Sequence, residues 1–250
     1  MKIRTGIIFV MFFTHISAFA QTMNVSYKSF SEKDTVMKYN ISAEFPQVDF
    51  GPDALMGVRG IAEDINNLLD TIIENKIINF RNDVKQTVNN AEMNDQESSL
   101  GITSSAEVIS STFLSAQIKK FSFVKGMAHP DTYIQSFNYS IVSTGYLQSL
   151  SDLFKPDADY LKYISGYCIN ELKTNAVKQG YTNIDDMINE RASPDIKNFN
   201  VWNISVDSLI ITFNPYTVAP YVFGIQTVSI SLANMTEMID PKGPLAFMFR

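Results

Sequence analysis

The sequence predicts an α+β fold, with one or more antiparallel sheets packed against one long and one shorter amphipathic helix. Apolar residues with helical spacing run over residues 54–85 and again over 156–180, whereas much of the remaining chain alternates apolar and polar residues as half-buried strands do. Strand and helix patterns do not alternate regularly along the chain, as they would in a doubly wound α/β protein.

Residues 1–20 have the three parts of a cleavable secretory signal. Two basic residues open the segment, residues 6–13 are continuously apolar, and Ala18 and Ala20 place small residues where a signal peptidase requires them. An uncleaved anchor is the alternative, but the apolar run is much shorter than the ~20 residues that span a bilayer. We therefore expect cleavage before Gln21, a periplasmic or secreted protein, and no membrane span in the mature chain.

Composition narrows the classes of function. The chain has 20 Lys and Arg against 26 Asp and Glu, a net charge of −6, whereas nucleic-acid binders usually carry a basic patch. The single cysteine, Cys168, cannot form an internal disulfide, and its apolar neighbours indicate a buried residue. Loss of the leader leaves His129 as the one histidine. A zinc site with several histidines is then impossible, and we expect no metal and no cofactor.

The N-terminal elements follow in order. Residues 24–44 alternate as the two strands of a hairpin, with a polar break at 31–34. Pro46 should end the second strand, because it cannot donate a ladder hydrogen bond. Residues 54–85 predict one long helix. Its polar face is acidic and rich in amides, which favours packing on a core over binding to a membrane surface.

The middle of the chain predicts more strands. Residues 89–99 are polar and aperiodic, which is typical of a loop. Alternating patterns then predict strands near 114–123 and 133–141, separated by a turn at 126–130. A tight turn at residues 144–145 closes this region.

The last third begins with the shorter helix. Asp157 is its expected N-cap, and Gly180 is expected to end it in a left-handed conformation. A polar helical piece follows at 184–190, and the alternating segments after it predict strands at 202–206, 209–213 and 228–232. Residues 241–250 form a tail that leaves the core, although residues 245–249 are apolar enough to dock on it.

The familiar catalytic patterns are incomplete. There is no Gly-x-Ser-x-Gly elbow, phosphate-binding loop or EF-hand loop. His129 could serve as a base, but nothing in the sequence indicates its nucleophile. Several aspartates could take part in carboxylate catalysis. Each of them lies in a predicted turn or at a predicted helix start, where a capping role explains the aspartate. These aspartates are Asp152, Asp157, Asp159, Asp185 and Asp186.

We therefore expect a binding protein and not an enzyme. Two alternatives stay open: a cell-wall hydrolase or transferase that uses carboxylates or His129, and a structural subunit of an envelope assembly.

Two loop motifs stand out as candidate contact sites. In the first, Gly126 and Pro130 make a tight connection around His129, which either bonds the backbone or contacts a ligand. In the second, Tyr216 and Tyr221 crowd a bend, either as tyrosines packed over a strand corner or as an aromatic binding platform. The candidate residues of the two motifs are Gly126, His129, Pro130, Tyr216, Pro220, Tyr221 and Gly224.

These motifs resemble those of a known family. Residues 126–130 match a Gly-Gly-Ala-His-Pro-like turn, in which Met127 replaces the second glycine. A Thr-Gly turn followed by Leu-x-Asp-Leu-Phe at residues 150–154, and Tyr-x-x-Ala-Pro-Tyr-x-x-Gly over 216–224, continue the pattern, as does Pro46 after an early strand. The chain thus resembles the paired DUF4163 and DUF3298 modules of lysozyme-sensing anti-sigma factors and of some peptidoglycan deacetylases.

The resemblance implies an organisation and a role. It divides the mature chain into a DUF4163-like half at 21–130 and a DUF3298-like half at 131–240, which we expect to share one core. The best-understood members bind lysozyme, and no sigma-binding segment or deacetylase domain is recognised here. We therefore expect an exported binding module of the bacterial cell envelope, with a lysozyme-like protein or a cell-wall glycan such as peptidoglycan as its partner.

Overall fold

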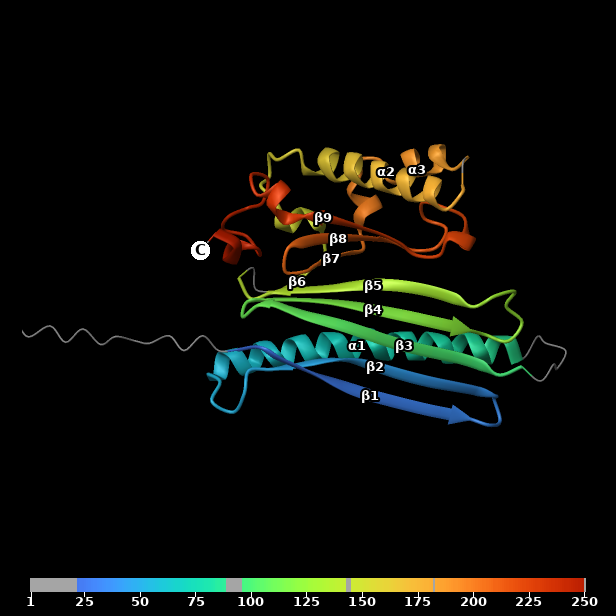
Figure 1. Cartoon of the computed structure of the whole chain (residues 1–250). Helices are drawn as coiled ribbons and strands as arrows, with labels where there is room; N and C mark the ends of the chain where they lie inside the picture. Colours follow the sequence, from blue (N-terminus) through green and yellow to red (C-terminus); the bar gives the residue numbers. More distant parts are fainter. Residues whose placement is uncertain (1–21, 89–95, 143–144, 182, 250) are drawn as a thin grey trace, which may run out of the picture.

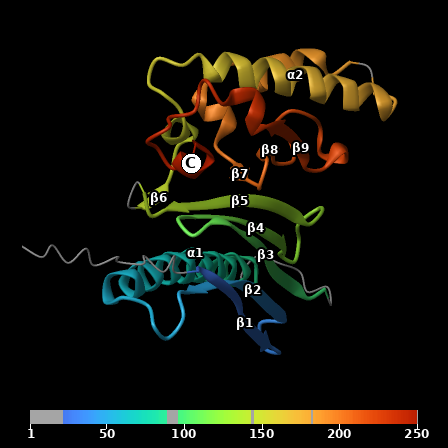
Figure 2. The same ribbon diagram turned by 60° about the vertical axis from the view of Figure 1, so that its left-hand side comes forward.

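Two sheets lie between two sets of helices in the computed structural model, which describes residues 22–88, 96–142, 145–181 and 183–249 (Figure 1). The expected leader at 1–20 lies outside these residues. The layers follow one another as helix α1, a six-stranded sheet, a three-stranded sheet, and the outer helices α2 and α3 (Figure 2). The mixture of helices and strands confirms the predicted α+β class.

The six-stranded sheet has the order β1-β2-β3-β4-β5-β6. Its strands are β1 (Asn24–Asp34), β2 (Tyr39–Asp49), β3 (Ser98–Ser110), β4 (Phe113–Phe123), β5 (Asp131–Ser140) and β6 (Gly145–Leu147). Neighbours in the sheet are antiparallel, with the exception of β2 and β3, which run parallel. Helix α1 (Met56–Val88) connects those two strands, because a parallel pair needs a crossover.

The N-terminal hairpin is confirmed, but its turn and its end differ from the prediction. The expected break at 31–34 is part of β1, and the turn follows it, held by Asp34 Oδ1, which accepts from the N–H groups of Val36 and Met37 at 2.8 Å. Pro46 lies within β2 and pairs with Tyr27. Strand β3 accompanies β2 only as far as Ala43, so the missing N–H of Pro46 breaks no ladder there.

Helix α1 follows the predicted apolar stripe closely. Its buried residues recur every three or four positions, as packing on a core requires. They include Ile65, Leu69, Ile73, Ile77, Phe80 and Val84. Strands β1 to β5 curve around this helix (Figures 1 and 2). The strand β3 was missed by the pattern analysis, since serines, Gly101 and Thr103 dilute its alternation.

The second layer contains α2 (Tyr160–Lys178), α3 (Asp185–Arg191) and an antiparallel sheet of β7 (Trp202–Ile204), β8 (Ser208–Phe213) and β9 (Gln226–Ser231). Gly180 ends α2 as predicted, with φ +82° and a hydrogen bond from Tyr181 N to Ala176 O of 3.0 Å. The N-cap is Asp159 and not Asp157, because α2 begins only at Tyr160.

The structure has two hydrophobic clusters where one shared core was expected. One lies between α1 and the six-stranded sheet, and the other contains α2, the three-stranded sheet and the C-terminal segment. Strands β5 and β6 pair into the first sheet, so the layers divide after Leu147 and not at residue 130.

A buried polar seam joins β4 and β5 to β7. Ser115 Oγ donates to Asn138 Oδ1 at 2.7 Å and accepts from Asn203 Nδ2 and Ile204 N, both at 3.0 Å. Asn138 Nδ2 donates to Trp202 O at 2.9 Å. These bonds fix how the two sheets lie relative to each other, since buried polar groups tolerate few geometries.

The C-terminal tail docks on the second cluster and does not leave it. Leu245 is fully buried, and the ring of Phe247 lies 6.3 Å from that of Phe113. Within the described residues, no helix is both long and apolar enough to span a membrane.

Candidate functional site

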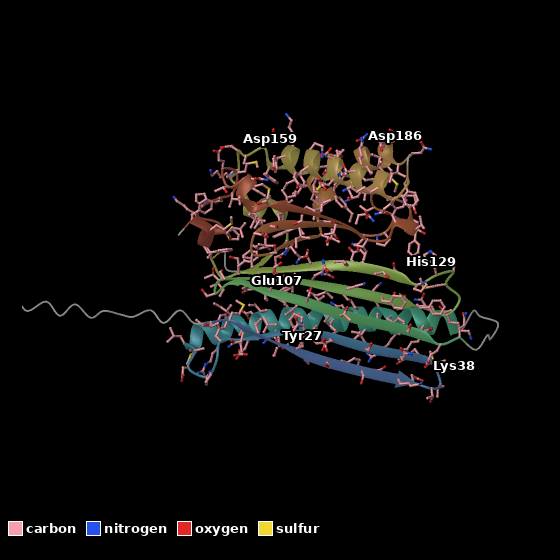
Figure 3. All side chains as sticks on the ribbon, viewed as in Figure 1. Tyr27, Lys38, Glu107, His129, Asp159 and Asp186 are labelled. Carbon is pink, nitrogen blue, oxygen red and sulfur yellow. The ribbon has the colours of Figure 1, made fainter. Side chains whose placement is uncertain are left out.

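The two loop motifs meet in space. The ring of His129 stacks on that of Tyr221, with centroids 4.2 Å apart and planes 28° from parallel. The ring of Tyr216 lies 5.3 Å from Tyr221, and its hydroxyl is 3.4 Å from His129 Nε2. We call His129, Tyr216 and Tyr221 the aromatic cluster. It lies where the turn after β4 reaches the second layer, at the same end of the molecule as Asp186 (Figure 3).

Local backbone geometry positions the histidine. Gly126 has φ +93°, in the left-handed region that glycine adopts without strain, and Met127 N bonds Val124 O at 2.9 Å to close the turn. The Pro130 carbonyl then accepts from Tyr221 Oη at 2.8 Å and lies 3.0 Å from His129 Nδ1. Gly126 thus shapes the turn, and the Pro130 carbonyl contacts two members of the cluster.

The loop between β8 and β9 positions the tyrosines. Tyr216 has φ +66°, which is rare for a residue with a side chain and is found mostly where function or tight packing requires it. Pro220 precedes the short 3-10 helix η3 (Tyr221–Phe223), and Gly224 ends it with φ +65°. The ring of Tyr181 lies 3.9 Å from that of Phe223, so the end of α2 supports η3 from behind.

The cluster is open to solvent. Tyr216 is 59% exposed, His129 is also exposed, and Tyr221 is half-buried. Tyrosines that only fill a strand corner would bury most of their rings. The exposure therefore favours the aromatic platform over the packing interpretation.

A cleft of about 440 Å³ begins at Tyr216 and continues along β8. Its walls include Tyr133 of β5, Arg191 at the end of α3, and Lys197 in the 3-10 helix η2 (Ile196–Phe199). Asn214 fixes the wall next to β5, because its side-chain amide bonds both the N–H and the C=O of Ile134, at 2.7 and 2.9 Å.

The floor of the cleft contains an unusual polar group. Thr212 is only 4% exposed, and its hydroxyl is buried with no hydrogen-bond partner among the residues that the structure describes. Most buried hydroxyls in proteins are paired, since leaving one unpaired costs about 1–3 kcal/mol. The unpaired Thr212 hydroxyl therefore marks the floor of this cleft as a place where a partner is expected.

The catalytic candidates are explained by local structure. Asp152 accepts from Ser149 N at 3.2 Å in the capping box of the 3-10 helix η1 (Leu150–Leu153). Asp185 and Asp186 occupy the first turn of α3, and Asp159, the N-cap of α2, lies at the other end of the helical layer from Asp186 (Figure 3). Burial raises the pKa of the Cys168 thiol to about 12, so it is unreactive at neutral pH.

No metal site is visible in the described parts of the chain, where no three His, Cys, Asp or Glu side chains lie close enough together to hold an ion. Among the described residues, the His129 ring contacts Tyr216, Tyr221 and the Pro130 carbonyl. None of these is a serine or cysteine nucleophile.

Sequence reasoning named His129, Tyr216 and Tyr221 in two separate motifs, but it did not predict their contact, and it missed the cleft. Arg191, Lys197 and Thr212 come from a short helix, a 3-10 turn and a strand, and none belongs to a recognisable motif. Their only signal lies in the three-dimensional arrangement, which the local pattern does not contain.

Comparisons with known proteins agree with this fold. Residues 151–233 match the family model described as "Protein of unknown function (DUF3298)". The Bacillus subtilis "Peptidoglycan-N-acetylmuramic acid deacetylase PdaC" is 32% identical over 114 residues, which is 46% of this chain. The matched region spans about a quarter (24%) of that protein's length.

Two solved structures share the architecture. A DUF3298 family member from Bacteroides fragilis aligns over 88% of this chain and 95% of its own, with a TM-score of 0.62 and 16% identity. A second, from Pseudomonas aeruginosa, aligns over 89% of this chain and 97% of its own, with a TM-score of 0.58 and 12% identity. At these identities the likeness concerns the fold alone. The DUF4163 likeness of residues 21–130 stays a prediction, whereas residues 151–233 match the DUF3298 family model.

Proposed function

We propose that the protein is an exported, non-enzymatic binding module of the bacterial cell envelope, and that it binds a cell-wall glycan on the aromatic cluster. The carrying observation is the exposed stack of His129, Tyr216 and Tyr221, built by two loops from different layers. Rings of this kind offer flat apolar faces to a sugar and polar edges to its hydroxyls. The neighbouring cleft adds amide and cationic side chains, the mixture expected of a ligand site.

The cellular setting of the proposal has two supports. Residues 1–20 have the pattern of a secretory signal, which would place the mature protein where the wall is. The Bacillus relative is named for an action on peptidoglycan, although the match covers only a quarter of it. A binding module that works outside the cytoplasm, at the cell wall, is consistent with both the signal pattern and this relative.

Co-sedimentation with purified peptidoglycan sacculi tests the proposal. We expect the mature protein to sediment with the sacculi, and Tyr216→Ala to bind about tenfold more weakly, since one aromatic contact contributes ~1.5 kcal/mol. Tyr27→Ala is the matched control, because Tyr27 is also exposed but lies on β1, away from the cluster. The absence of binding at tens of micromolar, or equal binding by Tyr216→Ala, would contradict the proposal.

The same preparation tests the alternatives. Binding to lysozyme but not to sacculi would show that the ligand is a protein and not a glycan. Release of soluble wall fragments, abolished in His129→Ala or Asp152→Asn, would show a hydrolase or transferase. A partner that co-purifies in fixed stoichiometry would indicate a structural subunit.

A further inference from the structure

We infer that the cleft beside the aromatic cluster binds a carboxylate group of the glycan, with Arg191 as its main partner and Lys197 and Thr212 as supports. The inference rests on the proposed function, because it concerns the part of the same ligand that extends beyond Tyr216. Tyr216 belongs to both the cluster and the cleft wall, so one ligand can occupy both without a gap.

The charge of the cleft is opposite to that of the whole chain. Arg191 and Lys197 line it, and no acidic residue does, although the protein has a net charge of −6. A cationic recess on an acidic protein attracts an anion locally while the rest of the surface repels it. This pattern favours an acidic ligand group at the cleft over a neutral one.

Arg191 is the better placed of the two cations. Its side chain is 58% exposed, and its approach to Glu190 is through Nε at 3.6 Å, which is longer than a hydrogen bond. The guanidinium can therefore present paired N–H donors to the two oxygens of a carboxylate. Lys197 is already paired with Asp195 at 2.7 Å, so it contributes less than Arg191 does.

Thr212 supplies a further donor group among the residues that line the cleft. Its hydroxyl is buried and unpaired, and the residue is 4% exposed on the cleft floor. Rotation of the side chain toward the cleft would let the hydroxyl donate to an oxygen held by Arg191. A bound carboxylate thus satisfies a polar group that the described residues leave unsatisfied.

Calorimetric titration with three glycans of equal length tests the inference and separates two sources of the carboxylate. The first alternates N-acetylglucosamine with N-acetylmuramic acid and carries free lactyl carboxylates. The second carries short peptides on those lactyl groups, so that its carboxylates lie at the peptide ends. The third is a chitin oligosaccharide, which has no carboxylate. We expect at least one carboxylate-bearing glycan to bind about tenfold more tightly than the chitin oligosaccharide, with a preference that weakens as salt rises.

Variants assign that preference to the cleft. Arg191→Gln with Lys197→Gln should remove this preference, so that the carboxylate-bearing glycans and the chitin oligosaccharide bind with similar affinity. Lys162→Gln with Lys242→Gln changes the net charge equally, on exposed lysines outside the cleft, and should preserve it. Thr212→Val should weaken the binding of the carboxylate-bearing glycan several-fold, and the variant should still fold.

The outcomes distinguish the inference from the proposed function. Equal affinity of the wild-type protein for all three glycans would overturn the carboxylate site and leave the proposed glycan binding intact. So would an equal effect of the control double variant and the cleft double variant on the preference. Failure of the wild-type protein to bind any of the three overturns both.

Discussion

The imidazole of His129 lies against the phenol ring of Tyr221 at a centroid distance of 4.2 Å, although the two residues belong to different layers of the fold. His129 comes from the turn between β4 and β5 in the first sheet, and Tyr221 from the connection between β8 and β9 in the second. The contact therefore exists only when the two layers are docked, and the site depends on the seam between them.

The hydroxyl of Tyr221 ties this contact to the turn, because it donates to Pro130 O at 2.8 Å. Tyr221→Phe removes the bond and keeps the ring. We predict a loss of about 1 kcal/mol in the free energy of unfolding, measured by urea denaturation. Tyr133 is an exposed tyrosine on β5, and Tyr133→Phe should change the free energy of unfolding by less than ~0.5 kcal/mol. Equal effects would show that the Tyr221 bond does not stabilise the turn.

Gly224 gives the second loop its shape. Its backbone has φ +65° and ψ −152°, a combination that is almost restricted to glycine. We predict that Gly224→Ala lowers the free energy of unfolding by about 1–3 kcal/mol, through backbone strain and not through a clash, since a Cβ there meets no atom within 4 Å.

Gly60→Ala is the matched control for this change. Gly60 lies inside α1, and its Cβ position is also open, so alanine should stabilise the helix by up to ~1 kcal/mol. If backbone conformation is the cause of the loss in Gly224→Ala, the midpoint temperature of thermal unfolding should fall in that variant and rise in Gly60→Ala. A neutral Gly224→Ala would show that the loop adapts freely.

Ser115 carries the polar seam, since its hydroxyl takes part in three buried hydrogen bonds, two of which, from Asn203 and Ile204, cross between the sheets. We predict that Ser115→Ala costs about 3 kcal/mol of unfolding free energy, because its partners stay buried without a replacement. Ser105→Ala, on the exposed side of the neighbouring β3, should cost less than ~0.5 kcal/mol. Similar values for the two serines in urea denaturation would mean that the seam contributes little.

Glu32 should make stability depend on pH. Hydrogen bonds from Arg81 first, and from Tyr39 at 2.5 Å, hold the pKa of its carboxyl below the usual 4.5. A lowered folded-state pKa means that its stabilisation is present above pH 4.5 and disappears as the pH falls through the lower value. We predict that Glu32→Gln loses up to ~1 kcal/mol at pH 7, because both side chains are partly exposed.

The difference between wild type and Glu32→Gln should shrink as the pH falls below 4.5, where the free carboxyl of the unfolded chain is protonated. Glu107→Gln, exposed on β3, provides the comparison at each pH. A difference that is constant between pH 7 and pH 3 would rule out the ion pair as its source.

The sequence predicted the elements that have strong periodicity. The stripe through Ile65, Leu69 and Ile73 identified α1, Gly180 marked the end of α2, and the alternation around Ile211 identified β8. It did not predict β3, or the parallel pairing of β3 with β2, because Gly101 and its serine neighbours lack an apolar pattern. Pairing partners are a tertiary property that local alternation does not encode.

The site was predictable in one part and not in the other. His129 and Tyr221 lie in loops whose composition already indicated unusual backbone geometry, and the structure brings them together. Arg191 and Thr212 lie in ordinary helix and strand contexts. They line one cleft only through the tertiary fold, so no local motif could identify it.

Nuclear magnetic resonance of the His129 side chain gives the most direct test of glycan binding at the aromatic cluster. After removal of the leader, His129 is the sole histidine, so its labelled ring gives a single set of signals. Titration with the peptidoglycan glycan should shift these signals saturably, and Tyr216→Ala should move the midpoint of the titration to about tenfold higher glycan concentration. Ring signals that stay unchanged while the protein binds the glycan would place the site elsewhere and contradict the account.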